Sequence, residues 1–291
     1  MRQFYMLAAL SMGLLILFKY VPIYGLVLAF TDFNLRGGWL SSPWNDFKHF
    51  KWLFNDPFFL RVLFNTFWIS FLRIVFAFPA PILMALLLNE IHSTAYKRTV
   101  QTVSYLPHFI SWVILGGIFA ELLSVKRGPV AFLFEAVGLE PIGFLVHAPT
   151  FRGLLVVTGI WQSIGWGTIV YLAALASVDP SLYESAEIDG ANRRQKAIYI
   201  SLPSLIPVIT ILLLLQVGNI LDESFDQIFN LANSSVLPVA DVFETYIYRS
   251  GIVDGRYDYT TAVGLFKNVA GLIILIGVNS IIRRYSEYGV W

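Results

Sequence analysis

Long apolar runs alternate with short polar segments along the whole chain of 291 residues. A helix needs about 20 largely apolar residues to cross a bilayer. Six stretches meet this requirement, and we predict a membrane-spanning helix in each: 5–30, 62–88, 100–123, 152–175, 199–221 and 261–282. The first run is longer than the core of a signal peptide and lacks a convincing cleavage site, so it is interpreted as a span.

Composition supports this interpretation. Hydrophobic residues make up 57% of the chain and charged residues 13%, with a mean hydropathy of +0.67, whereas soluble domains carry about 25% charged residues. The net charge of +1 gives no indication of a nucleic-acid partner. The chain has no cysteine, which excludes disulfides, thiolate metal sites and cysteine catalysis. The predicted fold class is an all-α integral membrane protein with six transmembrane helices.

Basic residues in the loops predict the orientation, because they are enriched on the cytoplasmic side. With the N-terminus inside, the inner segments contain eight of them: Arg2, Lys97, Arg98, Arg193, Arg194, Lys196, Arg283 and Arg284. The outer loop 222–260 instead holds seven acids and only two basic residues, Arg249 and Arg256. The other outer segments are mixed. We therefore predict a multi-pass protein of the bacterial cytoplasmic (inner) membrane, with both termini cytoplasmic; the type of cell envelope stays open.

The outer segment 31–61 is unusually aromatic: Phe33, Trp39, Trp44, Phe47, Phe50, Trp52 and Phe54. Such rings settle at the headgroup level of a bilayer. An interfacial helix is favoured here over direct ligand binding.

The inner segment after the fourth predicted span has a distinct architecture. Asp179 or Ser181 can cap a short helix at about 181–189, and Gly190 tolerates the left-handed backbone that ends it. A second helix follows and is expected to break or bend at Pro203 and Pro207. Two short helices that meet at a glycine predict a compact knob in the cytoplasm.

This segment resembles the signature of the permease subunits of binding-protein-dependent ABC importers. Glu184 and Ala186 match its acidic and small positions, Gly190 follows at the required spacing, and Ile200, Leu202 and Pro203 close it. Ser185 stands where alanine is usual. The resemblance implies a type I permease fold in which this segment is the coupling helix that docks on an ATPase subunit. The implied coupling residues are Glu184, Ser185, Ala186, Asp189, Gly190, Leu202 and Pro203, with Glu184 for docking and Gly190 as a hinge.

The similarity extends over most of the chain, to the oligosaccharide and polysaccharide branch of these permeases, also described as lipoprotein-like sugar permeases. It is carried by the segments 19–30, 78–83, 105–112, 171–176, 218–221 and 262–267. The alginate importer permease is one possible match within the branch. The expected domains are a first span with its outer segment (1–61), a type I transmembrane domain (62–284) and a short tail (285–291).

Resemblance also implies the partners and the energy source. These are a second homologous permease as a heterodimer, two ATP-binding subunits that hold ATP and Mg, and an extracytoplasmic solute-binding protein. The expected function is oligosaccharide or polysaccharide import by alternating access, without a cofactor or metal in this chain. Which glycan is carried stays open.

Polar residues within the spans point to a substrate path, because such groups usually face a protein interior or an aqueous cavity. The candidates are Gln216, Asn219, Glu223, Asp226 and Arg73. The first four lie near one face of a predicted helix by 3- and 4-residue spacing. Contacts with a partner permease or neighbouring helices explain these four equally well. For Arg73 a structural ion pair is favoured over a place in the path.

The ambiguous residues His108 and Asn268 stay open in the same way, Lys19 is expected to snorkel to the interface, and Pro79, Pro81 and Pro107 are interpreted as kinks. Several acids at the outer mouth suit a neutral or cationic ligand better than a polyanion.

No phosphate-binding loop or His-Glu-x-x-His motif is present, which indicates a transport subunit rather than an enzyme. A permease for another small solute is the alternative. Inverted repeats would favour a secondary transporter, and paired acids or metal ligands within the spans would favour an intramembrane enzyme. The sequence shows neither pattern.

Overall fold

The computed structural model describes residues 2–34, 36–38, 41–222 and 225–285. Contacts divide the chain into two units, 1–63 with 243–270 and 64–242 with 271–291, so the division falls inside two long helices. Among the described residues, five helical runs are long and apolar enough to cross a membrane: Ala9–Phe30, Pro57–Asn89, Ala148–Leu175, Arg193–Gly218 and Tyr257–Arg284. They correspond to five of the six predicted spans.

The remaining predicted span, 100–123, is not straight. The helical run Thr94–Phe109 and helix α6 (Trp112–Leu122) pass the span test together, but they meet at a bend of 103°. A 3₁₀ turn, Leu106–Phe109, contains Pro107, and Ile110 and Ser111 follow in extended conformation. Pro107 therefore precedes a bend, as expected, but the bend is large enough to split the span into two segments.

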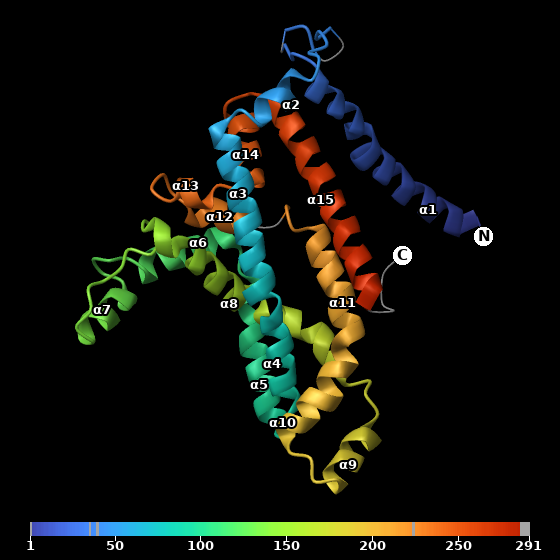
Figure 1. The fold of residues 1–291 in the computed structure, drawn as a ribbon, viewed down its shortest axis with the longest axis vertical. Helices are drawn as coiled ribbons and strands as arrows, with labels where there is room; N and C mark the ends of the chain where they lie inside the picture. Colours follow the sequence, from blue (N-terminus) through green and yellow to red (C-terminus); the bar gives the residue numbers. More distant parts are fainter. Residues whose placement is uncertain (1, 35, 39–40, 223–224, 286–291) are drawn as a thin grey trace. The chain divides into compact units, whose positions relative to one another are not determined.

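The first unit contains three whole helices: α1 (Arg2–Leu15), α2 (Lys48–Leu53) and α14 (Phe243–Ile247) (Figure 1). It also contains the start of α3 (Pro57–Leu72) and the first part of α15 (Tyr257–Tyr285). A β-bridge between Thr31 and Trp44 closes the loop before α2. The first unit also contains a group of polar side chains: the hydroxyls of Tyr246 and Tyr259 both donate to the Asp56 carboxylate, over 3.2 and 3.1 Å.

Aromatic side chains fill the loop of this unit. The ring of Phe30 stacks on Trp44, with centroids 5.4 Å apart, and contacts Phe47 and Phe50. Among the described residues between Thr31 and the start of α3, the helix is α2, with six residues. Trp39 lies outside the described residues. An interfacial position for these rings stays a prediction.

The second unit contains the remaining helices: α4 (Pro79–Asn89), α5 (Thr94–Tyr105), α6, α7 (Pro129–Ala136), α8 (Ala148–Leu175), α9 (Pro180–Ile188), α10 (Arg193–Lys196), α11 (Leu202–Gly218), α12 (Phe225–Leu231) and α13 (Leu237–Ala240) (Figure 1). One apolar core joins α3, α8, α12 and α13 around Phe151 and Ile228. A second core joins α4, α8 and α11 around Tyr171 and Leu205.

Three prolines within the long helical runs follow wide π turns. The segments Ile16–Tyr20, Arg73–Ala77 and Ala197–Ser201 each end two residues before a proline, namely Pro22, Pro79 and Pro203. In each, the residue before the proline donates its N–H to a carbonyl five residues back. The π turn moves backbone aside where a proline ring would clash with the preceding turn.

Of the break or bend predicted at Pro203 and Pro207, the break is therefore wrong. Arg193–Gly218 is one continuous helical run in which Pro203 follows a π turn and Pro207 lies inside α11. For Pro79 the predicted kink takes the same π-turn form.

Helices α12 and α13 are short and joined by irregular backbone, and side chains of the long helices donate hydrogen bonds to the carbonyls near α13. Arg152 on α8 donates to the carbonyl of Val239, over 3.0 Å, and to the amide oxygen of Asn65. Asn65 in turn donates to the carbonyls of Pro238 and Asp241. Irregular backbone within a membrane protein requires such internal partners.

Candidate functional site

The first candidate site is the segment 179–203, called the coupling knob from here on. Asp179 begins it: its carboxylate accepts from the N–H of Ser181 over 2.9 Å, and this hydrogen bond holds the pKa of Asp179 below its usual range. Helix α9 then runs to Ile188. The predicted cap and helix are both confirmed.

Gly190 ends α9 in the way the sequence predicts. Its φ is +77°, a backbone conformation that glycine adopts without strain. The N–H of Gly190 bonds the carbonyl of Glu187, and the N–H of Ala191 bonds that of Ala186. This pair of bonds is a Schellman motif, which satisfies carbonyls left open at a helix end.

Asn192 starts the next helix with a reciprocal capping box. Its side chain accepts from the backbone of Gln195 over 3.0 Å, and the Gln195 side chain accepts from the backbone N–H of Asn192 over 2.8 Å. Both ends of the turn 189–192 are thus fixed by local hydrogen bonds.

Two cross-links join the arms of the knob. Lys196 and Glu187 form an ion pair of 2.5 Å, and this hydrogen bond lowers the pKa of the Glu187 carboxyl. The hydroxyls of Tyr183 and Ser201 lie 2.9 Å apart, and Ser201 is buried. The knob is therefore tied to the helix that continues into the fifth span.

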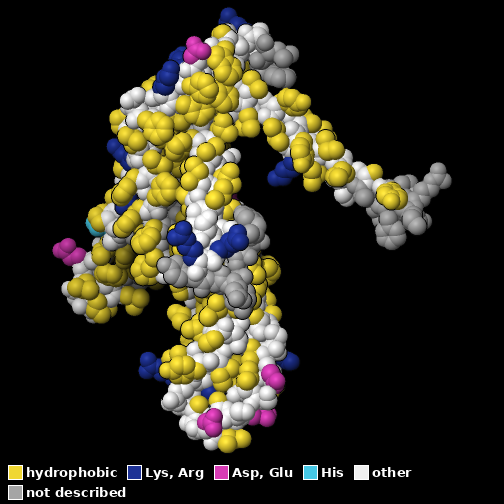
Figure 2. Space-filling view, turned by 45° about the vertical axis from the view of Figure 1, so that its right-hand side comes forward, with side chains coloured by type: hydrophobic (Ala, Val, Ile, Leu, Met, Phe, Trp, Pro, Cys, Tyr) yellow, Lys and Arg dark blue, Asp and Glu magenta, His cyan; other side chains and the backbone are white. Residues whose placement is uncertain are grey.

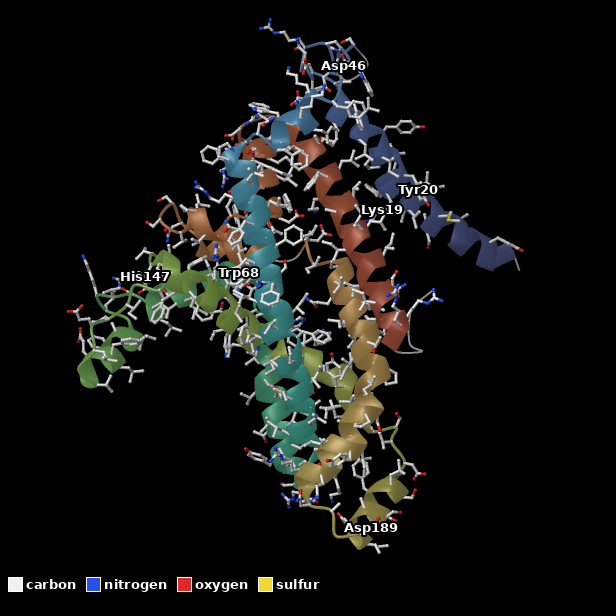
Figure 3. The ribbon with its side chains drawn as sticks, in the orientation of Figure 1. Lys19, Tyr20, Asp46, Trp68, His147 and Asp189 are labelled. Atoms are coloured by element: carbon white, nitrogen blue, oxygen red, sulfur yellow. The ribbon has the colours of Figure 1, made fainter. Side chains whose placement is uncertain are left out.

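The free end of the knob is exposed and partly apolar. Ile188 is 87% exposed, and Leu182 and Tyr199 are exposed as well. Glu184, Ser185, Asp189 and Gly190 are exposed, whereas Ala186 and Leu202 are half-buried. Asp189 lies at the end of the α9–α10 hairpin (Figure 3). This surface suits a protein partner, because exposed apolar side chains rimmed by polar ones mark interaction sites.

The second candidate site is a cavity of about 680 Å³ inside the second unit, called the α8–α11 cavity from here on. Its wall comes from α4, α6, α8, α11, α12 and the π turn that begins at Arg73. Four of the five predicted path residues border it: Arg73, Gln216, Asn219 and Asp226. Glu223 lies outside the described residues.

The reason given for grouping these residues is nevertheless wrong. Helix α11 ends at Gly218, and Asp226 belongs to the separate helix α12. Gly218 and Asn219 both have low helix propensity, which accounts for the end of α11 at this point. A turn, and not one helix face, brings the polar groups to the cavity.

Arg73 reaches the cavity wall through a polar chain. Its guanidinium donates to the amide oxygen of Gln227, and the Gln227 amide donates to the carbonyl of Leu155 and to the hydroxyl of Thr158, over 2.7 and 2.8 Å. Gln227 is only 3% exposed. Arg73 is thus held by the uncharged partner Gln227, and it also borders the α8–α11 cavity, so the two interpretations are not exclusive.

The sequence reasoning missed several residues of the cavity wall: Trp112, Gln162, Ser163, Trp166, Tyr171, Asp222, Phe225 and Gln227. Gln162 and Ser163 carry a signal, since two adjacent polar residues lie inside an apolar span. His108 does not line the cavity itself, but its ring stacks on that of Trp166, which does, with centroids 4.7 Å apart. Asn268 and Lys19 are exposed elsewhere.

In the first unit, Asp32, His49 and Asp258 lie close enough to share a cation. Each of the three already has a hydrogen-bond or ion-pair partner in the protein. The imidazole Nε2 lies 3.2 Å from the carbonyl of Thr31, Lys48 pairs with Asp32 over 3.0 Å, and the N–H of Phe33 donates to Asp258. A metal is not required to explain this cluster.

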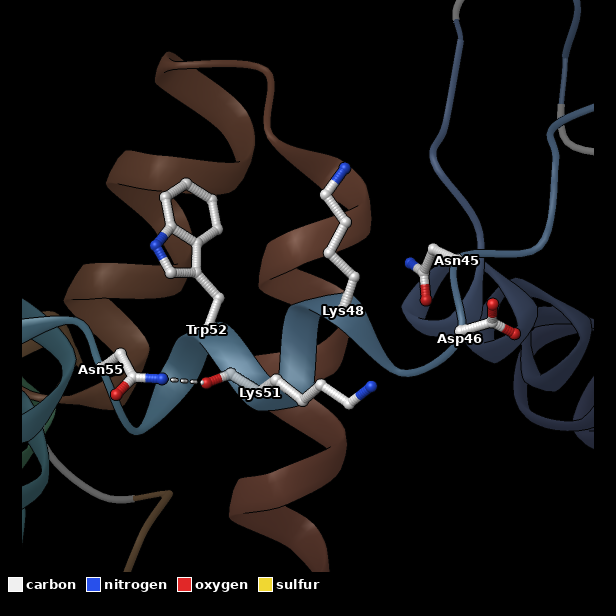
Figure 4. A pocket seen from close by; sticks show the side chains of 6 residues that line it. All are labelled: Asn45, Asp46, Lys48, Lys51, Trp52 and Asn55. Atoms are coloured by element: carbon white, nitrogen blue, oxygen red, sulfur yellow. Dashed lines mark hydrogen bonds between the residues drawn. The ribbon is translucent and has the colours of Figure 1, made fainter.

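A shallow hollow of about 590 Å³ lies beside α2, lined by Asn45, Asp46, Lys48, Lys51, Trp52 and Asn55 (Figure 4). The Asn55 amide donates to the carbonyl of Lys51. Apart from Asn45, the residues that line it are exposed.

Comparison with known proteins decides the family. Residues 77–286 match the family of binding-protein-dependent transport system inner membrane components. The chain belongs to this family. Family membership makes it a transport subunit of the inner membrane rather than an enzyme.

Individual relatives agree over nearly the full length. Protein LplB of Bacillus subtilis is 43% identical over 95% of this chain and 87% of the relative. The polygalacturonan/rhamnogalacturonan transport system permease protein YteP of the same organism is 42% identical over 95% of this chain and 86% of the relative. A bacterial alginate ABC transporter, solved in complex with an alginate-bound periplasmic protein, matches with a TM-score of 0.91 and 39% identity, over 99% of this chain and 96% of that chain.

These matches confirm the predicted fold, the type I ABC importer permease fold.

Proposed function

We propose that this permease imports an oligosaccharide or a polysaccharide segment, and that partner ATPases drive it through the coupling knob. The knob is the observation that supports the proposal most strongly. Its hairpin is closed by a Schellman motif, a capping box and two cross-links, so a push on its exposed end moves it as one body. A flexible loop would absorb the same push.

The proposed partners follow from the shape of the α8–α11 cavity. It is only partly enclosed, and a second homologous permease would complete a path across the membrane. Two ATPase subunits would bind ATP and Mg, one beneath each knob, and a solute-binding protein would deliver the sugar. In this arrangement both termini and the knob lie on the cytoplasmic side.

The cavity wall supports a saccharide as substrate. Trp112, Trp166 and Phe225 offer aromatic surface, while Gln162, Gln216 and Asn219 offer amide groups that donate to and accept from hydroxyls. The same wall includes the basic residue Arg73 and two acids, Asp222 and Asp226. This mixture suits hydroxyl-rich ligands, and it does not favour a polyanion such as alginate over a neutral glycan.

The test is the variant Glu184→Lys in the importer reconstituted with its ATPases and binding protein. Reversal of the charge on the exposed face of α9 should abolish substrate-stimulated ATP hydrolysis and uptake, while the subunit still inserts. Glu140→Lys, an exposed charge reversal outside the knob, is the control. Normal stimulated hydrolysis by Glu184→Lys would contradict the proposed coupling.

The substrate is tested separately. Uptake is measured with neutral oligosaccharides, with uronate oligomers, and with a non-saccharide solute. Transport of the non-saccharide alone would contradict the saccharide assignment and leave the coupling proposal intact.

A further inference from the structure

The segment between α6 and α8, residues 123–147, holds a helix that none of the predicted spans includes. Helix α7 starts with Pro129 at its first turn and has eight residues. It ends with a Schellman motif: Gly138 has a φ of +76°, its N–H bonds the carbonyl of Glu135, and the N–H of Leu139 bonds that of Phe134. Both ends are therefore defined by local structure, without a partner.

One face of α7 packs against its own unit. Ala131 is buried, and the ring of Phe134 meets Phe144 edge-on, with centroids 5.9 Å apart. An ion pair of 2.9 Å between Arg127 and Glu121 holds the preceding turn. These contacts fix which side of the helix faces outward.

The outward face is apolar. Phe132, Leu133 and Val137 are 60%, 67% and 71% exposed. Leu133 and Val137 are four residues apart, as are Phe132 and Ala136, so these side chains share one side of the helix. Glu135 lies off this face, beside Ala131. In Figure 1 α7 projects from the rest of its unit, and Figure 2 shows hydrophobic side chains over this lobe.

The chain itself identifies the occupant of this face. Six residues, 123–128, join α6 to α7. At about 3.3–3.6 Å per residue they keep α7 within roughly 20 Å of the end of α6, the second half of the bent apolar run Thr94–Leu122. At about 1.5 Å per residue, eight helical residues reach only about 12 Å, less than half the hydrocarbon thickness. Helix α7 is thus too short to cross the bilayer, and its linker keeps it near the apolar helices. An exposed apolar face on such a helix fits the boundary between headgroups and acyl chains.

We propose that α7 is an in-plane membrane anchor, whose Phe132, Leu133 and Val137 insert into the lipid interface beside the third and fourth spans. The anchor fixes the level of the 123–147 segment in the bilayer. That segment is bonded to the turn that follows α12, because the Asn233 amide donates to the carbonyl of Leu145 over 2.7 Å, and Asn233 lies between α12 and α13. The lipid interface thus positions the helix that carries Asp226 and Gln227.

Spin labels test the proposal directly, because the chain has no native cysteine. Leu133→Cys, Val137→Cys and Glu135→Cys are labelled one at a time in the full importer, with cysteine-free partner subunits, in vesicles of phosphatidylethanolamine and phosphatidylglycerol. Accessibility to oxygen, which concentrates in lipid, is compared with accessibility to a water-soluble nickel chelate.

The expected oxygen-to-nickel ratio is several-fold higher at positions 133 and 137 than at position 135. Water-like ratios at all three positions would overturn the proposal. So would shielding from both reagents at 133 and 137, because that result means a protein surface covers the face. Both outcomes leave the family assignment and the proposed coupling untouched.

Discussion

The coupling knob and the α8–α11 cavity belong to the same unit, but they are built in opposite ways. Residues within 25 positions of one another make the knob, and each of its turns is closed by neighbours in sequence. The cavity wall instead draws on α4, α6, α8, α11, α12 and a π turn, from Arg73 to Gln227. A part that transmits force has to be rigid, and local hydrogen bonds can provide that rigidity. A substrate path instead lies between several helices, so its wall comes from distant parts of the sequence.

The largest effect is expected where the knob depends on one backbone conformation. Gly190→Val places a β-branched residue at a φ of +77°, which costs about 1–3 kcal/mol of strain. Stimulated ATP hydrolysis should fall about tenfold or more, since each 1.4 kcal/mol is about a factor of ten. The measurement is ATPase activity in proteoliposomes with saturating substrate and binding protein.

Gly138→Val is the matched control for this change. Gly138 has nearly the same φ, +76°, and ends α7 with the same motif, but it lies outside the knob. Equal losses of coupling in both variants would show that the strain acts through general misfolding and not through the knob.

In the cavity, Gln227→Leu should have the next largest effect. It removes one hydrogen-bond acceptor of the Arg73 guanidinium, an interaction with a charged group worth about 1.5–3 kcal/mol. Transport should fall about tenfold, with basal ATP hydrolysis retained because the knob is untouched. Uptake and hydrolysis are measured on the same vesicles; a parallel fall in both would argue against a role in the path.

Trp166→Ala tests the aromatic surface of the path. Loss of the ring also frees its stacked partner His108, so the substrate concentration for half-maximal uptake should rise a few-fold while the maximal rate changes less. Trp68→Ala, on a stacked pair of α3 that does not line the cavity, is the comparison. An unchanged concentration dependence in Trp166→Ala would remove this ring from the path.

The smallest effect concerns the Glu187–Lys196 pair of the knob. The folded-state pKa of Glu187 lies below its ordinary value of 4.5, so its stabilising contribution is present above that pH and is lost as the pH falls through the folded pKa. The difference in thermal stability between the native protein and Glu187→Gln should therefore be small at pH 7 and vanish at acidic pH. A difference that grows on acidification would contradict the assignment.

Local construction explains how much the sequence could predict. The cap at Asp179, the end of α9 at Gly190 and the family signature are written in adjacent residues, and all three were predicted correctly. The size of the bend after Pro107 and the continuous helix through Pro203 were not predicted, because extended residues at Ile110 and Ser111 and a π turn at Ala197–Ser201 are choices among backbone states that apolarity does not distinguish.

The cavity was predicted only in part. Arg73, Gln216, Asn219 and Asp226 were found because polar groups in apolar spans are conspicuous, although the helix face assumed for three of them does not exist. Gln227 could not be assigned, since its role depends on Arg73, which lies 154 positions away in sequence. Contacts at that separation require the fold.

Cross-linking between the knob and an ATPase subunit tests the central claim most directly. Ile188→Cys, at the most exposed apolar position of the knob, is treated with a short bifunctional maleimide in the assembled importer, beside Val146→Cys on the segment before α8. The account predicts a cross-link to the ATPase subunit from position 188, none from position 146, and loss of stimulated ATP hydrolysis on cross-linking. Equal yields from both positions, or full activity in the cross-linked complex, would contradict it.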